Sequence, residues 1–160
     1  MVEPMPLPNE TVTSLAMALV QSSKAPLLLL DDDVVVIGAS TSFCNTFNLD
    51  PATIANRRLA ELGAGEWNVP QLNSLLQATI AGAAEIDAYE MDLVRKGKAT
   101  CRLILSAHKL DYLDTDKVRV VLAATDVTAT RLAEKHKDDL VREKQILLQE
   151  LQHRVANSLQ

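Results

Sequence analysis

Residues 99–110 read Ala-Thr-Cys-Arg-Leu-Ile-Leu-Ser-Ala-His-Lys-Leu, and this stretch decides the fold. Every second residue in it is small or apolar, namely Cys101, Leu103, Leu105 and Ala107. The residues between them are Arg102, Ile104, Ser106 and His108. A period of two is what a sheet with one buried face produces. We therefore expect a long antiparallel strand here.

Four more strands are expected around this one. A three-strand meander would be completed by strands at 86–94 and 117–124, with turns at 96–98 and 114–116. Upstream, the apolar runs 26–30 and 34–38 flank three consecutive aspartates at 31–33. These runs predict two short strands joined by an acidic turn.

Helical segments are expected between the two groups of strands. A short helix at 41–48 carries Phe43 and Phe47 four residues apart, and Asp50 caps another that has Pro51 at its first position. A further short turn covers 58–62, and Trp67 should cover the edge of the core. A longer helix at 71–83 has an inward face made of Leu72, Leu75, Leu76 and Ile80.

The N-terminal segment divides into a proline-rich lead-in and a helix. Residues 1–9 contain three prolines and should be extended. Asn9 or Thr11 could cap a helix that runs to about Ser22. Its apolar face consists of Val12, Leu15, Ala16, Leu19 and Val20. This face either packs on its own domain or pairs with the same helix of a second copy.

Composition restricts the class of protein. The 160 residues suffice for one domain and an added helix. A net charge of −5 argues against nucleic acid as the main partner, and no apolar run reaches the roughly 20 residues that span a bilayer. Cys44 and Cys101 form neither a CxxC pair nor a metal-ligand cluster. We expect a cytoplasmic protein with reduced thiols and no signal peptide.

The C-terminal segment, 129–160, contains neither proline nor glycine and should be a single helix. Ala133, Leu140 and Leu147 recur at intervals of seven, whereas Lys144 interrupts the seam. The last apolar stripe steps by four residues and consists of Leu147, Leu151, Val155 and Leu159. This pattern predicts a weak coiled coil with a register shift, through which the chain forms a homodimer.

His153 lies off the apolar stripe, with Arg154 next to it and Asn157 one turn later. Residues 147–160 read Leu-Leu-Gln-Glu-Leu-Gln-His-Arg-Val-Ala-Asn-Ser-Leu-Gln. This stretch resembles the dimerisation and phosphoacceptor box of bacterial sensor histidine kinases. The HWE and related subgroup is most similar, with Leu-Leu-x-Glu-x-x-His-Arg-Val-Lys-Asn-Asn-Leu-Gln. Ala156 and Ser158 depart from that pattern.

The resemblance implies a role for each polar residue of the box. His153 would be the phosphoacceptor, because a neutral imidazole is a competent nucleophile near pH 7. Glu150 would orient the imidazole, Arg154 would attract the phosphoryl group or an acidic partner, and Asn157 would help place a water for dephosphorylation. ATP and Mg²⁺ would bind a catalytic domain beyond Gln160, and a response regulator aspartate would receive the phosphoryl group. The alternative is a surface histidine on a coiled coil.

The order of elements over 25–128 resembles a PAS sensor domain. Asn48-Leu49-Asp50-Pro51 is similar to the family's turn into its short central helices, and Asp126-Val127-Thr128 to the Asp-x-Thr that ends its last strand. Ala55 stands where glycine is common. The fold class expected is α+β, a five-stranded antiparallel PAS-like sheet with short helices. The domains would be 1–24, 25–128 and 129–160.

No cofactor or metal is expected in this chain. Flavin-binding photosensors of the family carry Asn-Cys-Arg-Phe-Leu-Gln, whereas residues 56–61 here read Asn-Arg-Arg-Leu-Ala-Glu. Cys44 fits better as a buried apolar group. Haem-binding relatives need an axial histidine, commonly on the long helix, and the helix at 71–83 has none. His108, on an expected strand, is a less favoured candidate than an ordinary surface or core histidine. No histidine or cysteine spacing predicts zinc.

The combined interpretation is the sensory and dimerising portion of a two-component histidine kinase, inactive without its ATP-binding domain. The alternative is a non-catalytic PAS and coiled-coil module for signalling or ligand binding.

Overall fold

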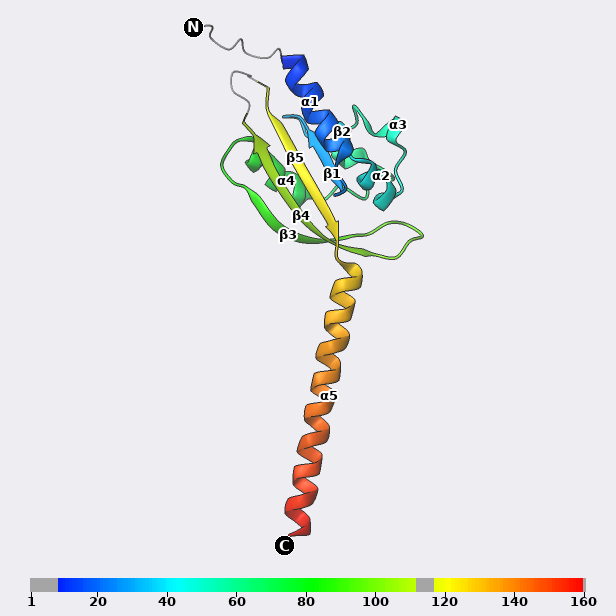
Figure 1. Cartoon of the computed structure of the whole chain (residues 1–160), viewed down its shortest axis with the longest axis vertical. Coiled ribbons are helices and arrows are strands. Elements are labelled where there is room, and N and C mark those ends of the chain that lie inside the picture. Colours follow the sequence, from blue (N-terminus) through cyan, green and yellow to red (C-terminus); the bar gives the residue numbers. More distant parts are fainter. Residues whose placement is uncertain (1–8, 112–116, 160) are drawn as a thin grey trace. The chain divides into compact units, whose positions relative to one another are not determined.

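The computed structural model describes residues 9–111 and 117–159, and it confirms the expected α+β fold. The chain divides into two units, one ending at Asp126 and one starting at Val127. In the first unit a five-stranded antiparallel sheet has the order β2-β1-β5-β4-β3 (Figure 1). The strands are β1 (Leu27–Leu30), β2 (Val36–Ala39), β3 (Ile86–Leu93), β4 (Cys101–Leu110) and β5 (Arg119–Asp126).

Strand β4 has the two faces that its sequence predicts. Its small and apolar residues, Cys101, Leu103, Leu105 and Ala107, are buried in the main core. The residues between them point to the other face, and His108 is exposed. The main core therefore lies on one face of the sheet, which we call the inner face.

Short helices cover the inner face. They are α2 (Thr41–Phe47), α3 (Pro51–Ile54), the 3₁₀ turn η1 (Leu59–Glu61) and α4 (Pro70–Ile80). The cap predicted at Asp50 is confirmed, since its carboxylate accepts a hydrogen bond from the Ala52 N–H. Trp67 lies fully inside the core rather than at its edge, because its ring packs against both Phe43 and Phe47.

Helix α1 (Asn9–Ser22) contacts β1 and β2 on the outer face of the sheet (Figure 1). Ala16 and Val20 are buried there against Leu29, as their spacing predicts. Leu15 and Leu19 are instead exposed, so the face packs on its own domain only in part, and pairing of the exposed part with a second copy stays a prediction. The helix therefore buries one side of its apolar face against the sheet and leaves the other side exposed. The side chain of Val12 lies outside the described residues.

Several element boundaries differ from the expected ones. Helix α4 ends at Ile80 rather than at 83, because Gly82 adopts a positive φ of 74° that stops the helix. Strand β2 begins at Val36, since Val34 turns with a φ of 59° and the Asp31 carboxylate accepts the Val35 N–H. The 96–98 turn is confirmed around Gly97, and the predicted turn at 114–116 lies outside the described residues.

The second unit is the helix α5 (Thr128–Ser158), which confirms the long helix expected from the lack of proline and glycine. It starts two residues after β5 ends. Within the described ranges, no helix combines the length and the apolar character needed to cross a membrane.

Candidate functional site

The candidate phosphoacceptor site lies in the last turns of α5. Glu150, His153, Arg154 and Asn157 are all exposed helical residues. His153 and Asn157 are four residues apart, so their side chains leave the same side of the helix one turn apart. Glu150 precedes His153 by three residues and lies on that side as well. The helix thus presents the imidazole to solvent, where a γ-phosphate could approach it.

The side chains of these four described residues form no hydrogen bonds or ion pairs with one another. The nearest side-chain hydrogen bond runs from the Ser158 hydroxyl to the Arg154 carbonyl, at 3.0 Å. Asp138 and Arg142 are four residues apart but form no ion pair in the described helix, whereas Arg131 pairs with Glu134 at 2.8 Å. The roles inferred for Glu150, Arg154 and Asn157 therefore stay predictions.

The apolar stripe of Leu147, Leu151, Val155 and Leu159 lies on the side of α5 away from His153. At 100° per residue, His153 is about 200° around the helix from Leu151. The large apolar side chains of this helix are exposed by 49% or more, and Leu159 is 83% exposed. They are Leu132, Leu140, Val141, Ile146, Leu147, Leu148, Leu151, Val155 and Leu159. No residue from 128 to 158 is buried in the single chain.

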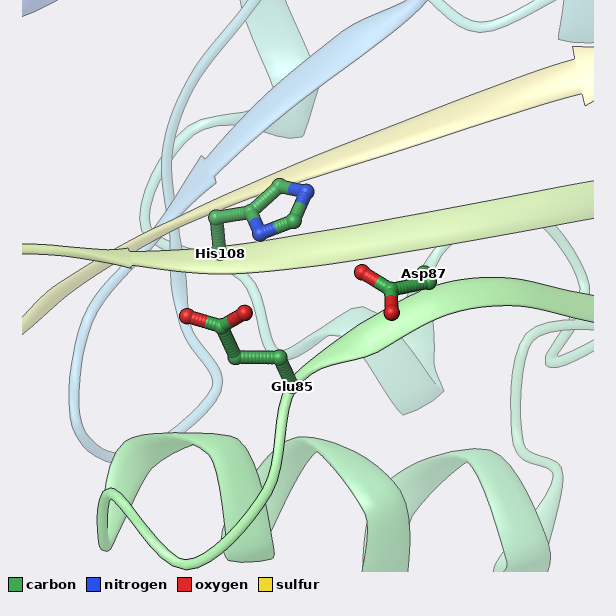
Figure 2. Close-up of side chains that lie close together, drawn as sticks. All are labelled: Glu85, Asp87 and His108. Atoms are coloured by element: carbon green, nitrogen blue, oxygen red, sulfur yellow. The ribbon is translucent and has the colours of Figure 1, made fainter.

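A second cluster, not predicted from the sequence, lies on the outer face of β3 and β4. Glu85, Asp87 and His108 are exposed, and one potential ligand atom from each lies within 4.8 Å of the others. Figure 2 shows the two carboxylates and the imidazole gathered on the same side of the two strands. Sequence spacing could not reveal this cluster, because Glu85 and His108 are distant in the chain and meet only through strand pairing.

Comparison with protein families matches residues 20–132 to the PAS fold, which covers well over half of the chain. The chain belongs to the PAS fold family. No curated protein matches its sequence.

Solved structures of PAS domains share the fold of this PAS protein at low sequence identity. The PAS domain of BvgS from Bordetella pertussis is 14% identical, with a TM-score of 0.60 over 83% of this chain and 99% of that domain. The photoactive yellow protein domain of the sensor histidine kinase Ppr from Rhodospirillum centenum is 11% identical, with a TM-score of 0.58 over 73% and 98%. A PAS domain from a two-component sensor histidine kinase is 9% identical, with a TM-score of 0.52 over 74% and 99%. At these identities the likeness shows the fold alone.

Three aromatic side chains pack together inside the mainly aliphatic core of the PAS unit. The Phe43 and Phe47 ring centroids lie 4.7 Å apart, and Trp67 meets Phe47 edge-on at 5.1 Å. Cys44 is buried beside them. Burial raises the pKa of the Cys44 thiol, and the charge of Asp50 raises this pKa further. A thiol in this setting remains protonated and unreactive.

Proposed function

We propose that this PAS protein is the sensory and dimerising portion of a two-component sensor histidine kinase and that His153 is its phosphoacceptor. The observation that carries the proposal is the box at 147–160, in which the histidine lies off the apolar stripe of an exposed helix. Two of the similar structures come from proteins described as sensor histidine kinases. Their likeness supports the kinase context only at the level of the fold.

The chemistry proposed for His153 needs little from its own helix. Phosphoryl transfer requires a nucleophile in line with the γ-phosphate, together with groups that neutralise charge. An exposed imidazole on a rigid helix supplies the nucleophile, and Arg154 supplies a positive charge beside it. ATP and Mg²⁺ would be held by a catalytic domain outside these 160 residues. The phosphoryl group would then pass to an aspartate of a response regulator.

The test is phosphorylation of the whole protein, including its catalytic domain, with γ-labelled ATP. Wild type should incorporate label that is labile in acid and stable in base, as a phosphoimidazole is. The variant His153→Ala should lose this label. The matched control is His136→Ala, which removes another exposed histidine of the same helix and should label normally.

Two results would contradict the proposal in different ways. Unchanged labelling of His153→Ala would show that another residue accepts the phosphoryl group. Lack of label in the wild type, with a folded protein by circular dichroism, would favour the alternative of a non-catalytic PAS and coiled-coil module. Because His153 is exposed, its replacement should leave the fold intact.

A further inference from the structure

Strand pairing explains why Glu85, Asp87 and His108 share the outer face of the sheet. Ile86 pairs with Ala107, and both of these residues are buried in the main core. Because side chains alternate along a strand, the neighbours Glu85, Asp87 and His108 point to the opposite face. Glu85 lies directly across from His108, as expected for the residues next to an antiparallel pair.

Strand β3 has an irregularity directly after Ile86. The register of β3 against β4 shifts between Ile86 and Tyr89, so that Asp87 and Ala88 together oppose Ser106. Such a bulge bends a strand and redirects the side chains around it. Beyond the bulge, Tyr89 pairs with Leu105 and the alternation resumes. The bulge thus occurs at the position where Asp87 converges on His108 (Figure 2).

The charges of the cluster are not balanced by a basic side chain. Farther along the same face of β3, Glu90 and Asp92 are bridged by Arg102, at 3.0 and 3.1 Å. In the described part of the chain, neither Glu85 nor Asp87 forms an ion pair with a lysine or arginine. Two carboxylates held close together without a cation repel each other, and a bound cation would relieve this repulsion.

We propose that Glu85, Asp87 and His108 form a binding site for a divalent transition-metal cation of the Zn²⁺ type. Ligands at about 2.1 Å from one ion lie at most about 4.2 Å apart. A spread of 4.8 Å therefore closes with small rotations of exposed side chains. One imidazole and two carboxylates suit Zn²⁺ or a similar ion, whereas Ca²⁺ and Mg²⁺ favour oxygen ligands alone.

Space is available for water molecules to complete the coordination. Glu85, Asp87 and His108 are all exposed, so solvent reaches the cluster directly. A surface hollow of about 200 Å³ lies beside it, lined by the two carboxylate residues and by Leu75 of α4, but not by His108. Three protein ligands with an open position suit an exchangeable ion rather than a structural one. This site departs from the sequence-based expectation that the chain holds no metal. It is also independent of phosphorylation at His153.

Calorimetric titration of the 160-residue chain with ZnCl₂ tests the proposal. Wild type should bind one ion per chain at its strongest site, and the ion should raise the melting temperature. His108→Ala should weaken this binding by at least about tenfold, because loss of a direct ligand costs no less than loss of a residue that orients one. Glu85→Gln and Asp87→Asn should each weaken Zn²⁺ binding as well.

Two control variants separate this site from non-specific binding. His136→Ala removes an exposed histidine of α5, and Asp32→Asn removes an exposed carboxylate of the β1–β2 turn. Both should bind Zn²⁺ like wild type, and millimolar Mg²⁺ should not displace the ion. Equal affinity of wild type and His108→Ala, or the absence of saturable binding, would overturn the proposal. All five substitutions are at exposed positions, so circular dichroism should show an unchanged fold.

Discussion

Replacing Ser40 with alanine should strongly destabilise the PAS unit. Ser40 is fully buried, and its hydroxyl forms three hydrogen bonds. The hydroxyl oxygen accepts from the Leu27 N–H at 2.9 Å and from the Phe43 N–H at 3.1 Å. The hydroxyl donates to the Ala25 carbonyl at 2.9 Å. One side chain thereby caps α2 and fixes the start of β1.

The expected cost follows from these three bonds. Loss of a serine N-cap typically costs about 1 kcal/mol. The Leu27 N–H and the Ala25 carbonyl also lose a partner in a part-buried setting, at about 1 kcal/mol each. We therefore expect Ser40→Ala to lower the free energy of unfolding by about 3 kcal/mol. For a domain of this size that corresponds to a drop in melting temperature of about 10 °C.

Urea unfolding followed by circular dichroism measures this change. The control is Ser74→Ala, because the Ser74 hydroxyl donates to the Pro70 carbonyl at 3.0 Å on the exposed side of α4. Its effect should stay within about 0.5 kcal/mol. If Ser40→Ala cost less than about 1 kcal/mol, the three hydrogen bonds could not be holding α2 to β1 as described.

Three other perturbations should give measurable effects. Phe47→Ala removes a ring from the aromatic core and should lower the free energy of unfolding by about 3 to 5 kcal/mol in the same assay. The raised pKa of Cys44 means that the folded state holds the thiol proton more tightly than the unfolded state does. The stability that this proton contributes is complete below the ordinary thiol pKa of 9.0 and is lost as the pH rises through the raised value. Cys44→Ala should flatten this alkaline fall in the free energy of unfolding. Leu151 is 57% exposed, so its burial in a dimer contributes about 1 to 1.5 kcal/mol per chain, or about 2 to 3 kcal/mol per dimer. Leu151→Ala should therefore raise the dimer dissociation constant, measured by light scattering, about 30- to 150-fold. Gln149→Ala is the control for the dimer, and a wild-type chain that stays monomeric at tens of micromolar would contradict this prediction.

Local patterns in the sequence were enough to predict most of the fold. The alternation in 99–110 defines a strand with one buried face, and Asp50-Pro51 defines a helix start, because each depends only on neighbouring residues. Ser40 was missed as a cap although its bond from the Phe43 N–H is local, and its other two bonds could not be predicted because their partners are 13 and 15 residues away. The burial of Trp67 was likewise set by the distant rings of Phe43 and Phe47.

The two candidate sites differ in how far a sequence can predict them. The phosphoacceptor box is contiguous, so residue spacing alone shows that His153 lies away from the leucines. To predict the cluster of Glu85, Asp87 and His108, one would need the register of β3 on β4 and the position of a bulge. Hydrophobic periodicity contains neither piece of information. For this reason the sequence left His108 as a surface or core histidine, with a haem ligand as the alternative, whereas the structure places it on the exposed outer face beside two carboxylates.

The exposed surface of α5 constrains where a partner can bind if the kinase proposal holds. Isolated helices are marginally stable in water, and a helix with this many exposed leucines needs a partner to cover them. A second copy seated on the stripe through Leu151 and Val155 would leave His153 accessible, because the imidazole lies about 200° from Leu151. Ile146, however, lies seven residues before His153 and within about 20° of it around the helix. A dimer centred on Ile146 would bury the histidine between the two helices and exclude the phosphoacceptor role.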